Sequence, residues 1–197
     1  ALSYAEIKML ATGNPYIKEK MDLDIQVQKL RLLKSSYLSE IYALEDKIIK
    51  YFPQQIAVKK ELISALESDL ATAQKHPKPT DDRFVGIEVK GAFYSEKAEG
   101  GQKIIDACQQ MNSPDPITLG TYRGFGLELS FDTMERAYKV KIRGAASCTI
   151  SLGTDLIGNI TRIDNAIVKI AERLENVRVV LEDLEKQFAV AKEEVRK

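Results

Sequence analysis

The stretch ITRIDNAIVKIAERLENVRVVLEDLEKQFAVAKEEV, residues 160–195, decides how this chain folds. Its apolar residues recur at intervals of three and four, which places them along one narrow line on a single helix. They are Ile160, Ile163, Ile167, Ile170, Leu174, Val177, Leu181, Leu184, Phe188, Ala191 and Val195. Such a line stays in register only when the helix supercoils against another helix, so the stretch predicts a coiled-coil helix that needs a partner.

The start of the chain carries the signals of a short helix followed by a long one. Ser3 and Glu6 have the spacing of a capping box, which predicts a short helix ending near residue 11. Gly13 is the residue type that ends a helix, and Asn14 with Pro15 is the pair that begins the next.

Apolar residues then recur at helical spacing over Tyr16–Phe52 and again after Pro53, so we expect a long opening arm from Pro15 to Lys75. Ile48 and Ile56 are eight residues apart rather than seven, so we expect a kink or a break at this proline. The arm is longer than the closing helix. It therefore either folds back near Pro53 or projects beyond its partner.

The middle of the chain has a different residue pattern: it contains short runs in which apolar and polar residues alternate, and eight of the eleven glycines. Alternation favours strands whose two faces differ, and Asp132–Glu135 has the length of a hairpin turn. The predicted strands are Phe84–Lys90, Ile117–Tyr122, Phe125–Phe131, Arg136–Arg143 and Ser147–Leu152. Gly100 and Gly101 lead into one predicted helix, Gln102–Met111.

The fold class that follows is α+β: long antiparallel coiled-coil helices flank a small antiparallel sheet with one packed helix. We expect a helical arm over residues 1–76, an α+β head over residues 77–153 and a coiled-coil helix over residues 154–197. The sequence leaves open whether the long helices pair within one chain or between two.

Composition limits the possible functions. The formal net charge is zero, so no global field attracts nucleic acid or anionic lipid. Cys108 and Cys148 lie in apolar patterns and are expected to be reduced and buried, with a disulfide or a reactive thiol as the alternatives. No apolar stretch approaches a membrane span of roughly 20 residues, and no signal peptide opens the chain, so the cytoplasm is expected. Because the chain begins at Ala1 without Met, we expect a piece of a longer protein.

The usual catalytic and cofactor motifs are missing. His76 is the one histidine, and two distant cysteines with one histidine cannot form a four-ligand zinc site. Gly124 to Gly126 leads into a predicted strand, so it is a bend and not a dinucleotide-binding turn. We therefore expect no catalytic residues, no metal and no cofactor. An enzyme of unrecognised type is the least favoured hypothesis.

One basic patch is suggestive. Lys139, Lys141 and Arg143 alternate along one predicted strand and project together, and Arg123 could join them from a neighbouring strand. Such a ladder suits phosphate contacts. The alternative is a solvated outer face on which Glu128 is a cross-strand partner.

Several segments also resemble the C-terminal region of very large proteins of conjugative elements and phages. Those bacterial proteins are similar to Swi/Snf-type helicases, often fused to an adenine-specific DNA methyltransferase-like region. The matching segments are Ser3–Lys8, Ala11–Pro15, Ile17–Lys20, Met21–Asp24, Tyr42–Asp46, Tyr51–Pro53 and Gly91–Tyr94. Met9 and Tyr16 depart from the expected small or aliphatic residues.

This resemblance implies a place on a DNA-handling machine and no activity, because helicase and methyltransferase motifs have no counterpart in these residues. The first hypothesis is therefore a noncatalytic C-terminal accessory module, a coiled-coil stalk with a head that positions the parent protein or contacts a partner. The second is a nucleic-acid-binding module that uses Arg123, Lys139, Lys141 and Arg143. The expected partner is the rest of the helicase-like parent, with DNA and a second copy through the coiled coil as further candidates, and no membrane.

Overall fold

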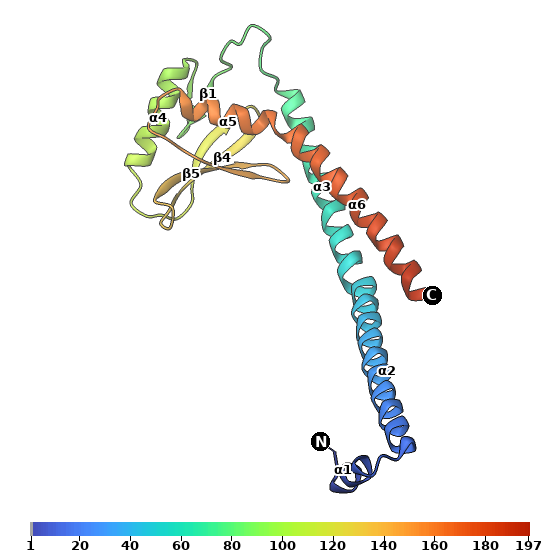
Figure 1. Cartoon of the computed structure of the whole chain (residues 1–197). Coiled ribbons are helices and arrows are strands. Elements are labelled where there is room, and N and C mark those ends of the chain that lie inside the picture. Colours follow the sequence, from blue (N-terminus) through green and yellow to red (C-terminus); the bar gives the residue numbers. More distant parts are fainter. Residues whose placement is uncertain (1) are drawn as a thin grey trace. The chain divides into compact units, whose positions relative to one another are not determined.

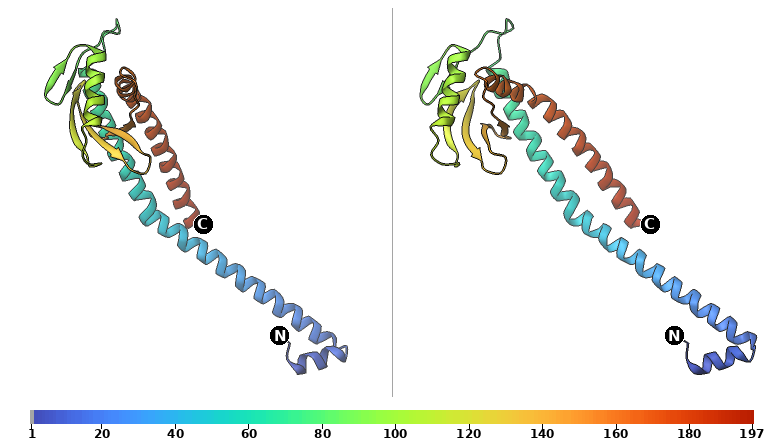
Figure 2. Two further views of the ribbon diagram at one scale, coloured as in Figure 1. Left: turned by 90° about the vertical axis from the view of Figure 1, so that its left-hand side faces the viewer. Right: turned by 60° about the vertical axis from the view of Figure 1, so that its left-hand side comes forward.

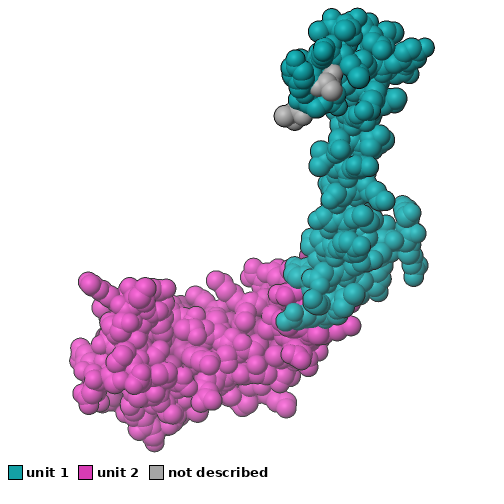
Figure 3. Space-filling model, turned by 90° about the horizontal axis from the view of Figure 1, so that it is seen from below, with its two compact units in different colours: residues 1–54, 186–197 teal, residues 55–185 magenta. Residues whose placement is uncertain are grey.

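The computed structural model describes residues 2–197, apart from the side chain of Ala5 (Figure 1). The fold is α+β, with long helices and an antiparallel sheet of six strands, as the sequence predicts. Packing divides the chain into two compact units (Figure 3). One contains residues 1–54 and 186–197, and the other contains residues 55–185. The predicted boundaries at residues 76 and 153 both lie inside the second unit, in segments that are neither helix nor strand.

The first unit opens with two helices. Helix α1 (Tyr4–Ala11) has the predicted capping box between Ser3 and Glu6, and helix α2 (Pro15–Asp46) has the predicted Asn14 cap. Gly13 between them has a φ of 72°, a left-handed conformation that glycine adopts without strain. The predicted helix ends are confirmed.

The expected kink or break at Pro53 is replaced by a π-helical segment, η1 (Lys47–Tyr51). In it the N–H of Phe52 donates to the carbonyl of Lys47, five residues earlier rather than four. A π segment holds one extra residue in a turn. It therefore absorbs the eight-residue interval between Ile48 and Ile56, and the helix runs directly into α3 (Phe52–Lys75).

The closing stretch forms helix α5 (Gly158–Val168) and helix α6 (Ile170–Arg196), and Lys169 interrupts what the sequence predicts as one helix. The interruption is slight, because the Lys169 N–H still bonds the carbonyl of Asn165. Each unit shows a contact between α3 and α6. In the first unit the Phe52 ring stacks on the Phe188 ring at 5.4 Å, and in the second Arg178 pairs with Glu67 at 3.0 Å. The partner of the closing helix is thus the opening arm of the same chain.

The sheet lies in the second unit, in the order β2-β1-β3-β4-β5-β6, with every pairing antiparallel. Its strands are β1 (Ile87–Val89), β2 (Ala92–Tyr94), β3 (Ile117–Tyr122), β4 (Phe125–Asp132), β5 (Ala137–Arg143) and β6 (Cys148–Ser151). The predicted alternation in β4 and β5 is confirmed. Strand β2 was not predicted, and β1 is shorter than the predicted run.

Two tight hairpin turns join neighbouring strands of this sheet. Lys90 and Gly91 join β1 to β2, and Arg123 with Gly124 joins β3 to β4; all four residues have positive φ. Two-residue turns of this kind match the twist of the flanking strands. Gly124 thus lies in a hairpin turn, and Phe125 and Gly126 are the first residues of β4.

Helix α4 (Lys97–Gln109) begins five residues earlier than predicted, so Gly100 and Gly101 lie inside it. Close packing accounts for both glycines. A Cβ at Gly101 would overlap the carbonyl oxygen of Leu156, and one at Gly100 would press on Ile87. Tertiary contact therefore outweighs the low helix propensity of glycine here.

Helices α3, α4 and α5 bury the same face of the sheet (Figure 2). The core of this unit joins residues of all three helices to those of the sheet, and it includes Leu66, Ile104, Leu119, Phe125, Leu127, Leu129, Val140, Ile160 and Ile163. The other face of the sheet carries polar residues and is not covered by these helices. The unit is therefore a two-layer arrangement with one bare sheet face.

Candidate functional site

The three basic residues of β5 lie together on the bare sheet face, as predicted. Lys139 pairs with Glu135 and donates to the hydroxyl of Ser151 at 2.7 Å, and its side chain is only 17% exposed. Arg143 pairs with Glu128 at 3.4 Å. The acidic partners offset much of the positive charge. Lys141, opposite Glu128 in the ladder, is exposed.

Arg123 does not belong to this patch, and the prediction that it would join the β5 residues is wrong. Its side chain is 7% exposed, pairs with the buried carboxylate of Asp164 at 3.2 Å and donates to the carbonyl of His76 at 2.9 Å. Strand alternation does not extend into a two-residue turn. The turn directs the Arg123 side chain to the helices instead.

Asp164 makes this a buried cluster. It also accepts a hydrogen bond from the Tyr122 hydroxyl at 2.8 Å. Burial, together with the hydrogen bond to Asp164 and its charge, raises the pKa of Tyr122 well above its usual value. The cluster links the end of α3, the β3–β4 turn and α5, so its role is to hold these three segments together.

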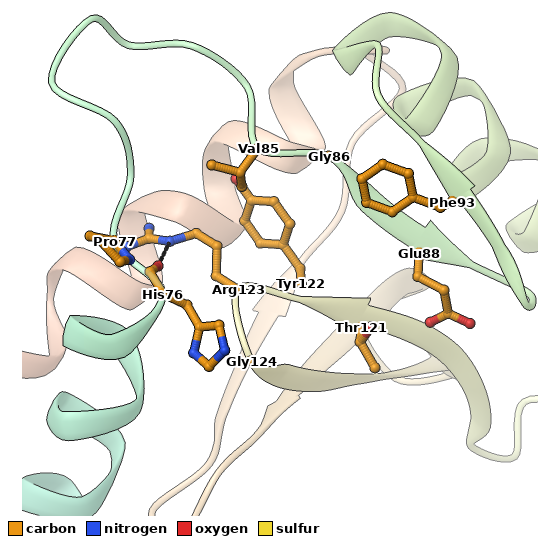
Figure 4. Close-up of a pocket in the computed structure, with 10 residues that line it drawn as sticks. All are labelled: His76, Pro77, Val85, Gly86, Glu88, Phe93, Thr121, Tyr122, Arg123 and Gly124. Carbon is orange, nitrogen blue, oxygen red and sulfur yellow. Dashed lines mark hydrogen bonds between the residues drawn. The ribbon is translucent and has the colours of Figure 1, made fainter.

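An open pocket of about 280 Å³ lies beside this cluster (Figure 4). His76 and Glu88 lie at opposite sides of it. Both are held by backbone groups: the Nδ1 atom of His76 lies 3.1 Å from the carbonyl of Thr72, and Glu88 accepts from the N–H of Gly91. The pocket therefore does not bring an acid–base pair together. Among residues 2–197, no group of three or more His, Cys, Asp or Glu side chains is placed to hold a metal ion.

A second basic surface, which the sequence reasoning missed, borders strand β6. A groove of about 420 Å³ lies between this strand and helices α5 and α6. Arg162, Lys169 and Arg173 line it, along with Cys148 and Ile150. Arg162, Lys169 and Arg173 are seven and four residues apart, so they share one helix face, but only the fold places strand β6 beside that face.

The two cysteines differ in environment. Cys108 is buried and its thiol is free; burial raises its pKa to about 11. Cys148 is also free but only half-buried, beside the groove, so the expectation of two buried thiols is correct for Cys108 alone. The two thiols do not form a disulfide in this structure.

Helix α2 exposes many apolar side chains of the first unit. None of its 32 residues is buried. Leu23, Leu30 and Tyr37 are seven residues apart and 52%, 64% and 57% exposed, and all belong to one line. Ile25 and Leu32 form a second exposed line on the opposite side, because an offset of two residues turns a helix by roughly 200°.

No helix of the described residues is long and apolar enough to cross a membrane. Comparison with known proteins adds no relationship: no protein-family model, curated protein or solved structure matches this chain.

Proposed function

We propose that this chain is a noncatalytic interaction module whose helix α2 docks another helix. The observation that carries the proposal is the exposed apolar line of α2, since contiguous exposed apolar surface marks interaction sites. The resemblance to the C-terminal region of helicase-like proteins supports a role as an accessory part of a DNA-handling protein. We place that role in the cytoplasm.

The partner that fits best is a second copy of the same helix. One core position of the seven-residue repeat is occupied by Leu23, Leu30, Tyr37 and Leu44. The second core position is then occupied by Lys20, Val27, Lys34 and Ile41. In a parallel pair like residues face each other, so Lys20 would meet Lys20 and Lys34 would meet Lys34. That arrangement puts like charges in the seam and is unfavourable.

An antiparallel pair avoids this conflict. With Val27 facing Leu30 of the second copy, Leu23 faces Lys34 of that copy and Lys20 faces its Tyr37, where the ammonium can lie against the ring. In the same register Asp24 flanks the seam beside Arg31 of the second copy, with opposite charge. Every core contact then joins a lysine to an apolar residue or two apolar residues to each other.

The seam of α2 also continues an interface already present. A groove lined by Tyr37, Ile41 and Leu44 lies beside Glu194, near the end of α6 in the same unit. The apolar line runs on from there toward the start of α2. A second helix would therefore cover the part of the line that α6 leaves bare.

Light scattering and sedimentation of the full chain test this function. We expect a dimer that Leu30→Glu converts to a monomer with unchanged helix content. Leu32→Glu is the matched control, because Leu32 is 71% exposed on the opposite side of α2 and its substitution should leave the dimer intact. A monomeric wild-type chain would contradict the second copy as partner.

The orientation has its own test. Spin labels at residue 29 lie close together across an antiparallel pair centred near residue 28, whereas labels at residue 18 lie about 30 Å apart along the axis. A parallel pair gives equal separations at the two sites, and that result would refute the proposed register. The labels go into a chain with Cys108 and Cys148 replaced by Ala.

Nucleic-acid binding by the bare sheet face is the second candidate function, and the exposed Lys141 is the observation that favours it. Lys141→Glu should then weaken salt-dependent binding of a DNA oligonucleotide. Lys50→Glu, on the exposed surface of the first unit, is the control. Equal binding by the two variants would remove this candidate.

A further inference from the structure

Strand β6 is an edge of the sheet, and its backbone leaves an open ladder position. The N–H of Leu152 donates to the carbonyl of Tyr138 at 2.9 Å, which fixes the alternation of hydrogen bonds between β6 and β5. Ile150 and Cys148 therefore direct their backbone groups toward β5. Thr149 and Ser151 direct theirs away from the sheet, where the groups are free to pair with a further strand.

The groove described above runs along this open edge. Ile150 and Cys148 form an apolar floor, and α5 and α6 form a wall that carries Arg162, Lys169 and Arg173. Arg162 donates to the amide oxygen of Asn159, and the guanidinium of Arg173 lies 3.4 Å from the carbonyl oxygen of Ser147. These partners are neutral, so they position the two cations without cancelling their charge. The lining contains no acidic residue.

We propose that this edge binds an extended acidic peptide segment, which adds to the sheet as a seventh strand. Its backbone pairs with the free N–H and C=O groups of Thr149 and Ser151, as in other complexes formed by strand addition. Alternate side chains of the segment point toward the helices, so carboxylates at those positions face Lys169, Arg162 and Arg173.

A peptide suits the groove better than a nucleic acid. Single strands of DNA or RNA gain much of their affinity by stacking bases on aromatic rings, and the lining has none. A phosphate backbone also has no N–H groups to pair with the strand carbonyls. An uncovered strand edge can pair with unintended strands. The three cations beside this edge favour an acidic strand over other strands.

Fluorescence anisotropy with a labelled peptide of alternating Glu and Val tests this proposal on the full chain. We expect binding that Lys169→Glu weakens by about fivefold or more, because reversing an exposed charge removes an attraction and adds a repulsion. Lys141→Glu makes the same charge change on the bare sheet face and serves as the control. The matching peptide of Lys and Val, and a DNA oligonucleotide, should bind more weakly.

The strand geometry is tested separately. Thr149→Pro removes an outward N–H that takes no part in the ladder with β5, and it should abolish peptide binding. Hydrogen exchange on the wild-type chain gives the same information without a substitution: the amides of Thr149 and Ser151 should gain protection when the peptide binds. Each of three results would overturn the proposal. They are unchanged exchange at both amides, binding of the oligonucleotide that is tighter than binding of the acidic peptide, and equal effects of Lys169→Glu and Lys141→Glu on peptide binding. None of these outcomes depends on pairing through α2.

Discussion

Replacing Arg123 with Met should strongly destabilise the unit that holds the sheet. The Arg123 and Asp164 side chains are 7% and 6% exposed. Removing the guanidinium takes the cation away from the Asp164 carboxylate and leaves it the hydrogen bond from the Tyr122 hydroxyl. A buried charge without its partner is unfavourable, since water no longer solvates it.

The expected loss is about 3–5 kcal/mol in the free energy of unfolding, the range for breaking a buried ion pair from one side. With a urea slope of about 2 kcal/mol per molar, the unfolding midpoint falls by roughly 2 M. The double variant Arg123→Met with Asp164→Leu should recover part of this loss, because neither charge is then buried alone.

Urea unfolding followed by circular dichroism measures these changes. Arg83→Met is the matched control, because Arg83 pairs with Asp81 on the exposed surface and its loss should leave the midpoint unchanged. Equal shifts of the midpoint in Arg123→Met and Arg83→Met would contradict a stabilising buried ion pair. So would a double variant whose loss equals the sum of the losses of its single variants.

Three further predictions follow from the same structure. Gly101→Ala should destabilise the fold by about 1–3 kcal/mol through overlap with Leu156, whereas Gly126→Ala, which meets only an ordinary contact, should not; thermal unfolding compares them. Because the pKa of Tyr122 is raised above its usual value of 10.0, the neutral phenol stabilises the fold fully below that pH. This contribution is lost as the pH rises toward the folded pKa, and the loss should disappear in Tyr122→Phe when unfolding is measured across alkaline pH. Cys148 should react with a maleimide faster than Cys108, whose pKa is raised to about 11 by burial, and mass spectrometry of the labelled chain reads out the order.

Local patterns predicted much of this fold. The alternation in β4 and β5 identified both strands and their faces, and the capping box marked the start of α1, because these signals depend on neighbouring residues. Strand β2 was missed because its turn, Lys90-Gly91, lacks the Asn or Asp that marks most such hairpins. Gly100 and Gly101 were misread because their role depends on a distant carbonyl at Leu156.

The candidate surfaces were less predictable. The three basic residues of β5 share a face, as their spacing predicts, but their pairing with Glu135 and Glu128 depends on the turn and on the ladder register. The groove beside β6 joins residues from a strand and two helices. Arg162, Lys169 and Arg173 have helical spacing in the sequence, whereas their position beside β6 arises from tertiary packing.

The β3–β4 turn has a consequence for the order of folding. Arg123 has a φ of 47°, an uncommon value for a residue with a side chain, and its hydrogen-bond partners lie 47 and 41 residues away along the chain. Contacts between such distant residues form only after long loops close. This hairpin should therefore reach its final form late, after α5 has arrived. Substitution of Arg123 should then speed unfolding far more than it slows refolding.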